Sequence, residues 1–391
     1  MAERKRKVCL YIGTLQRGGA ERVLGNLAES LFEEGFAVTL VTSYCAPPEY
    51  LLPHALWNEN TGLTPEGADD PDAGIRRVLS EPPEEMVSKG RLRNFLTRFS
   101  YLRAIWKKEN PDVILAFIGK CNLMAILTSR GLGIPVAVSV RALPAEEYRG
   151  RAMHLMADLL FPLADAVILQ AQGALSFFRE NVRKKAVILP NPLNPAFLQV
   201  QGAEERQKEI VCVGRLDENK DQALLLSAFA QAREKCEAVR AWTVRIYGDG
   251  PDREKLEKEA KALGLGTSAV FAGNVPDVAE RIRTASVFVL PSRTEGMPNS
   301  LLEAMSLGLA CIASDCPVGV PAELIQDGEN GLLFPVGDRD ALSDAIIQFA
   351  SDEALRERCG KEALFVRERF APERVFAQWR SCLEKLMDQK Q

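Results

Sequence analysis

The amino-acid sequence predicts an α/β protein built from two Rossmann-like domains. The chain has 391 residues, and two domains are expected because single hydrophobic cores stop growing at roughly 250 to 300 residues. Two stretches, residues 8–43 and 209–250, each contain an apolar strand, a turn, a helix and a second apolar strand. Repeats of this unit predict two parallel sheets with helices on both faces.

The first domain is expected to span residues 1–195. Short apolar runs bounded by turn residues predict its strands, which lie at 8–15, 37–43, 113–117, 135–140, 166–170 and 187–190. Helical spacing predicts helices at 23–35, near 92–108, after Gly119 and near 147–163. Residues 58–90 are polar and rich in proline and are interpreted as an insertion.

The second domain is expected to span residues 205–371, after a polar linker. Its predicted strands lie at 209–216, 243–250, 271–275, 287–292, 310–314 and 331–334, and a helix is expected at 223–235. A closing helix at 372–391 is expected to pack back on the first domain.

Composition indicates a globular protein of a reducing compartment. The net charge is −4, and 47% of the residues are hydrophobic, which is ordinary for a soluble chain. The nine cysteines lack any Cys-x-x-Cys spacing, so neither a disulfide framework nor a zinc site is expected. No apolar run approaches the roughly 20 residues that span a bilayer. We expect a cytoplasmic protein, with at most a peripheral contact at the inner face of the cell membrane, and no nucleic-acid partner.

Two glutamates, Glu295 and Glu303, lie eight positions apart across a predicted junction of strand, loop and helix. Backbone N–H groups of residues 297–301 are expected to be unpaired at the helix start and to attract a phosphate. Glu303 can then accept hydrogen bonds from a ribose diol, and Glu295 can reach the hydroxyls of a sugar. Alternatively, Glu303 is a first-turn residue that complements the helix dipole and Glu295 is a solvated loop residue.

Residues 295–319, EGMPNSLLEAMSLGLACIASDCPVG, resemble the E-x7-E motif of the retaining glycosyltransferases of family 4, the group 1 glycosyltransferases. The resemblance covers nearly the whole chain and is strongest over residues 209–340 and at GGAER, residues 18–22. It implies the GT-B fold, in which two Rossmann-like domains face each other across a deep cleft. The donor contacts implied in this segment are Gly296, Met297, Pro298, Asn299, Ser300, Leu301 and Glu303.

Arg215 and Lys220 follow the first strand of the second domain, in the sequence GRLDENKDQ. The matching arginine and lysine of family 4 bind the donor diphosphate, and the resemblance implies that role here. A departing sugar leaves negative charge on the diphosphate, so catalysis needs cations already aimed there. With Glu295, these two residues form the predicted catalytic set. The alternative is an ordinary solvated turn, because DENK is a typical turn sequence.

Glycines beside the predicted strands allow the backbone to come close to a ligand. Gly18 and Gly19 follow the first strand, and the resemblance places them in the donor site. Gly248 and Gly250 are predicted to shape the pocket wall, Gly214 is placed in the donor site, and backbone groups around Val275 are predicted to lie against the base.

Metal-dependent transfer is the rival mechanism. The chain contains two Asp-x-Asp triplets, at Asp70–Asp72 and Asp338–Asp340, a pattern that holds a divalent cation in GT-A enzymes. The first triplet lies in a polar loop, and the second is interpreted as the N-cap of a helix. We therefore predict no metal requirement and no cofactor besides the nucleotide-sugar substrate.

Acceptor contacts are predicted on the first domain. Some family 4 members carry a histidine where this chain reads FIGKCN, so Lys120 stands at the corresponding place. Arg141 follows a predicted strand and is the candidate for a phosphate contact, an ordinary surface arginine being the alternative.

The helix near 92–108 carries an apolar stripe surrounded by basic residues; the stripe consists of Leu92, Phe95, Phe99, Leu102 and Trp106. Such a stripe is usually core packing with snorkelling cations. The alternative is an interfacial patch that meets anionic lipid and a polyprenyl-diphosphate acceptor.

The resemblance implies a retaining transferase that moves a hexose or N-acetylhexosamine from a nucleotide sugar, with UDP favoured, to a glycan or lipid-linked glycan in surface polysaccharide or glycolipid synthesis. The alternative is a catalytically silent GT-B module that binds nucleotide or glycan and partners another transferase. No G-x-G-x-x-G follows the first strand of either half, which argues against a dehydrogenase.

Overall fold

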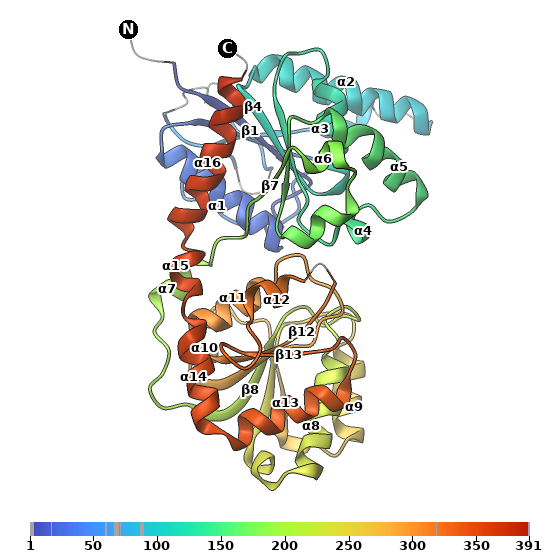
Figure 1. Cartoon of the computed structure of the whole chain (residues 1–391). Helices are drawn as coiled ribbons and strands as arrows, with labels where there is room; N and C mark the ends of the chain where they lie inside the picture. Colours follow the sequence, from blue (N-terminus) through green and yellow to red (C-terminus); the bar gives the residue numbers. More distant parts are fainter. Residues whose placement is uncertain are drawn as a thin grey trace. The chain divides into compact units, whose positions relative to one another are not determined.

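The computed structural model describes residues 4–16, 18–58, 61–65, 70, 72–86, 90–317 and 319–389. Internal contacts divide the chain into two structural units. Unit 1 consists of Met1–Pro190 with Val375–Gln391, and unit 2 of Asn191–Arg374. Figure 1 shows the chain with its helices and strands labelled.

Unit 1 contains a seven-stranded parallel sheet in the order β3-β2-β1-β4-β5-β6-β7. Its strands are β1 (Lys7–Ile12), β2 (Ala37–Thr42), β3 (Arg76–Leu79), β4 (Val113–Phe117), β5 (Val136–Ser139), β6 (Ala166–Leu169) and β7 (Ala186–Ile188). Strand β3 lies inside the insertion predicted at 58–90. This strand was not predicted because its sequence, RRVL, begins with two arginines and is not an apolar run. One of the two, Arg77, is nevertheless buried.

Helices cover both faces of this sheet. They are α1 (Gly19–Glu33), η1 (Glu84–Met86), α2 (Arg91–Glu109), α3 (Gly119–Ser129), α4 (Pro144–Glu147), α5 (Arg151–Leu160), η2 (Phe161–Leu163), η3 (Gln172–Phe177), α6 (Glu180–Arg183) and α16 (Pro372–Asp388). The prediction of a single helix near 147–163 is wrong. Gly150 has a φ of 92°, a conformation that glycine adopts without strain, and it separates α4 from α5.

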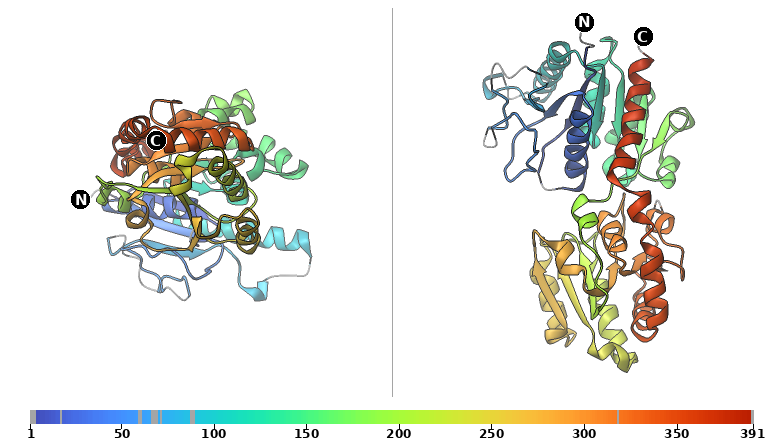
Figure 2. Two further views of the ribbon diagram at one scale, coloured as in Figure 1. Left: turned by 90° about the horizontal axis from the view of Figure 1, so that it is seen from below. Right: turned by 90° about the vertical axis from the view of Figure 1, so that its left-hand side faces the viewer.

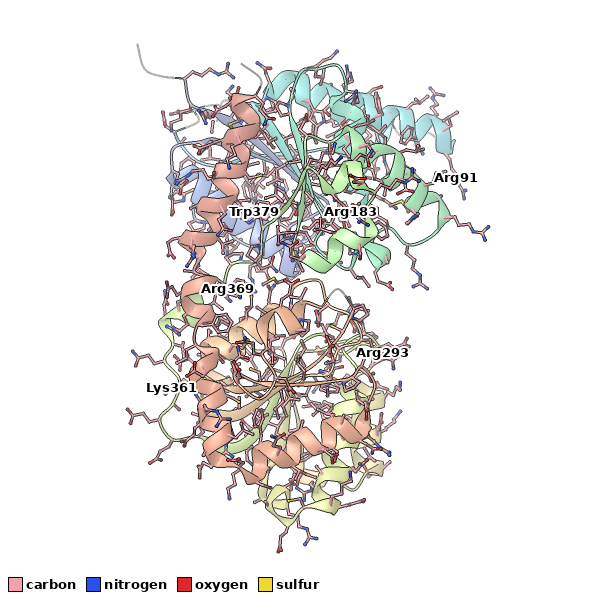
Figure 3. All side chains as sticks on the ribbon, in the orientation of Figure 1. Arg91, Arg183, Arg293, Lys361, Arg369 and Trp379 are labelled. Atoms are coloured by element: carbon pink, nitrogen blue, oxygen red, sulfur yellow. The ribbon has the colours of Figure 1, made fainter. Side chains whose placement is uncertain are left out.

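Helix α16 closes the chain on unit 1 and contributes to its hydrophobic core. The right-hand view of Figure 2 shows it running alongside the strands of that sheet. Trp379, labelled in Figure 3, is fully buried, and its ring centroid lies 5.5 Å from that of Phe117 on β4. The sheet-facing residues of α16 therefore belong to the same core as β1, β4 and α1.

Unit 2 contains a six-stranded parallel sheet in the order β10-β9-β8-β11-β12-β13. Its strands are β8 (Gln207–Val213), β9 (Thr243–Tyr247), β10 (Ala269–Gly273), β11 (Ala285–Leu290), β12 (Ala310–Ser314) and β13 (Leu332–Phe334). Its helices are α7 (Pro195–Gln199), α8 (Gln222–Lys235), η4 (Glu237–Ala241), α9 (Arg253–Ala262), η5 (Gly266–Ser268), α10 (Val278–Ile282), α11 (Asn299–Ser306), α12 (Val320–Leu324), α13 (Arg339–Ser351), α14 (Glu353–Ala363) and α15 (Val366–Arg369).

Each sheet has one point where the strand order reverses direction. In unit 1 it lies between β1 and β4, and in unit 2 between β8 and β11. Loops that leave the carboxyl ends of these strand pairs diverge to opposite faces of the sheet, and ligands of open α/β sheets bind in the crevice between them. This geometry positions the candidate site.

Candidate active site

The predicted catalytic residues of unit 2 gather at its switch point. Gly214 and Arg215 follow β8, while the loop that carries Glu295 follows β11 and leads into α11. The two loops are hydrogen-bonded to each other through Asn219. Its carbonyl accepts from the Arg293 N–H at 2.8 Å, and its Oδ1 accepts from the Thr294 N–H at 3.1 Å. The loop after β8 therefore sets the position of the loop that holds Glu295.

Lys220 and Glu295 form an ion pair across this junction. Lys220 Nζ lies 2.6 Å from Glu295 Oε1, although the residues are 75 positions apart in sequence. The Ser292 hydroxyl, itself buried, donates to the same oxygen at 2.6 Å. Glu295 is 8% exposed, so the alternative that it is a solvated loop residue is wrong. Sequence reasoning missed Ser292, which it placed at the end of the predicted strand 287–292; in the structure β11 ends at Leu290 and Ser292 lies in the loop.

Arg215 differs from Lys220 in its exposure. Its side chain is 71% exposed, and its Nε lies 3.6 Å from Asp217 Oδ2. The turn predicted as the alternative is present, because the Lys220 N–H donates to the Asp217 side chain at 3.0 Å. The turn directs the Lys220 ammonium toward Glu295 and leaves the Arg215 guanidinium accessible to a ligand.

Helix α11 begins at Asn299, with Pro298 at its N-cap and no side-chain cap. The prediction of an unpaired N–H at Leu301 is wrong, because this group donates to the Pro298 carbonyl at 3.0 Å. Met297 and Leu301 are both buried, so their side chains belong to the packing around the helix start. The Asn299 side chain accepts from Asn191 Nδ2 at 2.7 Å, which anchors the start of the helix.

Glu303 is the fifth residue of α11 and is 7% exposed. The alternative that it is a first-turn residue complementing the helix dipole is therefore wrong, because the dipole effect is confined to the first turn. The structure places Glu303 one turn beyond the helix start, while Glu295 precedes that start. Gly296 and Ser300 lie between the two glutamates along the chain.

Glycines let the strand ends of unit 2 approach each other closely. The Gly214 N–H donates to the Tyr247 carbonyl at 3.0 Å, and the Gly248 N–H donates to the Gly273 carbonyl at 2.9 Å. Gly248 has a φ of 128°, and a Cβ there would overlap the carbonyl oxygen of Gly214. Val275, predicted to lie against the base, follows β10 and is half-buried.

Gly248→Ala is expected to lower the free energy of unfolding by about 3 kcal/mol or more, because the added methyl meets fixed backbone at a strained φ. Urea denaturation monitored by circular dichroism measures this. The control is Gly264→Ala, since Gly264 has a φ of 68° but open space around its Cβ position, and we expect a loss of about 1 to 2 kcal/mol there. Equal losses in the two variants would contradict the overlap.

The glycine-rich turn of unit 1 lies at the start of α1. Gly18 is the N-cap, with a φ of −117°, and Gly19 is the first helical residue. A Cβ at Gly18 would overlap the Glu21 carboxylate. Burial raises the pKa of Glu21 above its ordinary value. This carboxylate beside the glycine turn was not predicted, although it lies within the GGAER motif.

Lys120 is exposed at the second position of α3, directly after β4. The chain before it is strained, because Ile118 has a φ of 71°, which is rare for a β-branched residue. Glu147 holds this turn by accepting from the Gly119 N–H at 2.7 Å and from the Arg141 N–H at 2.9 Å. Glu147 thus links the ends of β4 and β5, a role that no local sequence pattern indicated.

Arg141 is 8% exposed, so the alternative of an ordinary surface arginine is wrong. Its guanidinium carbon lies 5.1 Å from the ring centroid of Phe117 and 5.4 Å from that of Trp379. Burial lowers the pKa of Arg141 to about 9, against an opposing effect of Glu147. The Arg141 side chain thus packs against two aromatic rings. The phosphate contact predicted for it remains a prediction.

The apolar stripe of α2 was interpreted from the sequence either as core packing or as an exposed interfacial patch, and its residues divide between the two. Leu102 and Trp106 are buried, as core packing requires, and Trp106 Nε1 donates to Thr128 Oγ1 at 2.8 Å. Leu92 and Phe95 are instead 73% and 41% exposed. Among the described residues, no helix is both long and apolar enough to cross a membrane.

The Asp-x-Asp triplets do not share a common role. Asp338 caps α13 by accepting from the Ala341 N–H at 2.9 Å, which confirms the N-cap prediction. In the first triplet, Asp70 accepts from the Asp72 N–H at 2.9 Å, and the residue between them lies outside the described part of the chain. Within the described residues, Glu29, Glu33 and His54 of unit 1 are close enough to share an ion, but such exposed groups are common and we assign no site there.

Two doubly wound parallel sheets, with glycines and charged side chains at their switch points, define an α/β protein of the GT-B class. Residues 194–364 match the model of the glycosyl transferases group 1, and residues 18–192 match the glycosyl transferase 4-like domain. The chain belongs to the group 1 glycosyltransferases of family 4, and it is a transferase. The predicted family and fold are thereby confirmed.

Relatives with known names support this assignment. An exopolysaccharide phosphotransferase of Streptomyces coelicolor is 32% identical over 59% of this chain, but the match spans only 24% of that protein. An α-1,4-N-acetyl-D-galactosaminyltransferase of Campylobacter jejuni, named for a glycan on PP-undecaprenol, is 26% identical and matches over 90% of both chains. Among solved structures, Anabaena HepE in complex with UDP aligns with a TM-score of 0.76 at 16% identity, over 97% of this chain and 100% of HepE.

Proposed function

We propose that this enzyme transfers a hexose or N-acetylhexosamine, with retention, from a UDP-sugar to a lipid-linked glycan during surface polysaccharide synthesis. The observation that carries the proposal is the ion pair between the half-buried Lys220 and the buried Glu295, beside the start of α11. It joins a cation to a sugar-binding carboxylate at the point where ligands of such sheets bind. The acceptor class is supported by the Campylobacter relative named for PP-undecaprenol, and UDP by the ligand of Anabaena HepE.

Each residue has a distinct role in the proposed mechanism. Arg215 offers a planar fork and Lys220 a point charge to the two donor phosphates. These cations and the N–H groups at the start of α11 stabilise the developing charge on the leaving phosphate. Together they take the role that a metal ion has in metal-dependent transferases. Glu295 holds sugar hydroxyls, and Glu303 holds the ribose. The departing phosphate oxygen takes the acceptor proton, so the reaction requires no separate general base.

A panel of UDP-, GDP- and ADP-sugars, screened by thermal shift with EDTA present, tests the donor and the metal independence. An activity assay with the donor that stabilises the protein and a polyprenyl-diphosphate-linked glycan tests the acceptor class. Assignment of the product anomer by NMR tests retention. Stabilisation by a nucleotide without turnover on any acceptor would instead indicate the silent module. An inverted anomer would exclude the front-face mechanism.

Glu303→Ala is expected to weaken UDP binding by roughly tenfold to several hundredfold, because hydrogen bonds to a charged group contribute about 1.5 to 3 kcal/mol each. Titration calorimetry with UDP measures the change. Glu329→Ala, which removes an exposed glutamate of the same unit, is the control and should bind normally. Unchanged affinity in a folded Glu303→Ala protein would remove Glu303 from the donor site.

A further inference from the structure

A groove of about 540 Å³ lies in unit 1 between α2, α3 and α5. Its walls are largely apolar and include Phe95, Leu102, Met124, Met153 and Met156. Methionine side chains are flexible and polarizable, so a wall that contains three of them adapts to a ligand of variable shape. The groove therefore suits an apolar chain better than a rigid polar molecule.

One end of the groove reaches the edge of the sheet where substrates of this fold bind. Ser43 follows β2, Ser80 follows β3 and Lys120 follows β4, and all three line the groove. The carboxyl ends of parallel strands form the ligand-binding edge of an α/β sheet. A molecule in the groove can thus extend from that edge along α2 and α5.

The two helices that flank the groove expose further apolar side chains. In α2, Leu92 is 73% and Leu96 is 53% exposed; in α5, Leu155 is 56% and Leu159 is 62% exposed. Single exposed leucines are ordinary, but several on neighbouring elements mark a site of interaction. Figure 1 shows α2 and α5 on the same side of unit 1.

Basic residues line the same groove. Arg91, at the outer end of α2 in Figure 3, joins Arg98 and Lys120 in its lining. The acidic residue among them is Glu81, which pairs with Arg98 at 2.6 Å. The net charge of the lining is therefore positive. An apolar wall with a cationic border complements a ligand that has an apolar tail and an anionic head.

We propose that this groove binds the phosphate-proximal isoprene units of a polyprenyl-diphosphate-linked acceptor, with the diphosphate toward Lys120 and Arg91. The inference rests on the proposed function and names the part of the chain that recognises the lipid. A concave groove with walls from three helices encloses a single chain, whereas a flat apolar face would rest on a bilayer. Phe95 and Met156 line the groove, while Leu96 and Leu159 lie on the same helices outside it.

Calorimetry with farnesyl diphosphate, on the chain of 391 residues, tests the groove. Phe95→Glu and Met156→Glu should each weaken binding by about tenfold or more, because a carboxylate then replaces an apolar wall. Leu96→Glu and Leu159→Glu add the same charge to the same helices outside the groove, and they should bind within about twofold of the unmodified protein. Inorganic pyrophosphate should bind weakly and equally to all five proteins.

Other outcomes overturn the proposal. Equal losses in all four variants, matched by equal losses in sedimentation with phosphatidylglycerol vesicles, would show a membrane-contacting face in place of a groove. Farnesyl diphosphate that binds no better than pyrophosphate would exclude the site. The proposed function fails separately, because it requires UDP-sugar binding to unit 2, which thermal shift reports without any lipid.

Discussion

Lys220→Ala is expected to lower turnover by about a hundredfold or more at saturating donor, as is Arg215→Ala, because in the proposed mechanism each cation stabilises the charge that develops on the leaving phosphate. The two variants are expected to differ in stability. Lys220 pairs with the buried Glu295, whereas the Arg215 side chain is 71% exposed. Lys220→Ala therefore also destabilises the fold, since it leaves a buried carboxylate without its counter-charge. Initial rates with a verified donor, measured well below each variant's melting temperature, separate the two effects.

Arg293→Ala is the matched control for this experiment. Arg293 lies two residues before Glu295, is 50% exposed, and pairs with Asp221 at 2.9 Å. Its removal changes the net charge of the same loops but leaves the Lys220–Glu295 pair intact, so turnover should stay within a few-fold of the unmodified enzyme. Normal turnover in both Lys220→Ala and Arg215→Ala would show that the catalytic assignment is wrong.

Glu49→Gln is expected to lower the free energy of unfolding at neutral pH by about 3 to 5 kcal/mol, because it leaves a buried guanidinium without a counter-charge. Glu49 Oε2 lies 2.6 Å from Nη1 of Arg77, whose side chain is fully buried. Glu49 also accepts from the Leu15 N–H at 3.4 Å. The pair therefore supports the segment that leads into the glycine turn at Gly18.

This loss should depend on pH in a defined direction. Burial alone would raise the pKa of Glu49, but hydrogen bonds from Arg77, Ala46 and Leu15 outweigh it, and the pKa is lowered from its ordinary 4.5. A carboxyl with a depressed pKa contributes stability above its unfolded pKa and loses it as the pH falls through the folded value. The difference between Glu49→Gln and the unmodified protein should be full above about pH 5 and should shrink at lower pH.

Urea denaturation at neutral pH and near pH 4 tests both the loss of stability in Glu49→Gln and its decrease at low pH. Glu180→Gln is the control, because Glu180 forms an exposed pair with Lys184, with side chains 81% and 74% exposed. Its effect should stay within about 0.5 kcal/mol at both pH values. A pH-independent loss in Glu49→Gln would mean that packing, and not charge, holds Arg77 in place.

Local pattern was sufficient for most of the fold. Buried parallel strands such as β4 and β12 are continuous apolar runs, so their limits follow from the sequence alone. The helix cap at Asp338 was predicted because its hydrogen bond is made three residues away. Strand β3 was missed because burial of Arg77 depends on Glu49, a partner 28 residues distant.

The candidate site likewise has features that the sequence predicted and features that only the structure showed. Its residue types were predicted from the resemblance: Glu295 and Glu303 beside a helix start, with Arg215 and Lys220 after a strand. The structure then revised their surroundings. Glu295 is buried against Lys220 and Ser292, and the Leu301 N–H is already paired with Pro298. Side-chain burial of this kind arises from residues that meet only when β8 and β11 lie next to each other.

By itself, the sequence determined the class of the protein, the positions of most of its strands and the identity of the charged residues after them, because periodicity and motif are local properties of the chain. Only the tertiary structure decided which charges neutralise each other and which side chains face solvent. The Lys220–Glu295 pair joins residues 75 positions apart, and the groove in unit 1 is formed by segments from Tyr11 to Met156. Contacts over such separations depend on how the sheet orders its strands, and no short stretch of sequence carries that information.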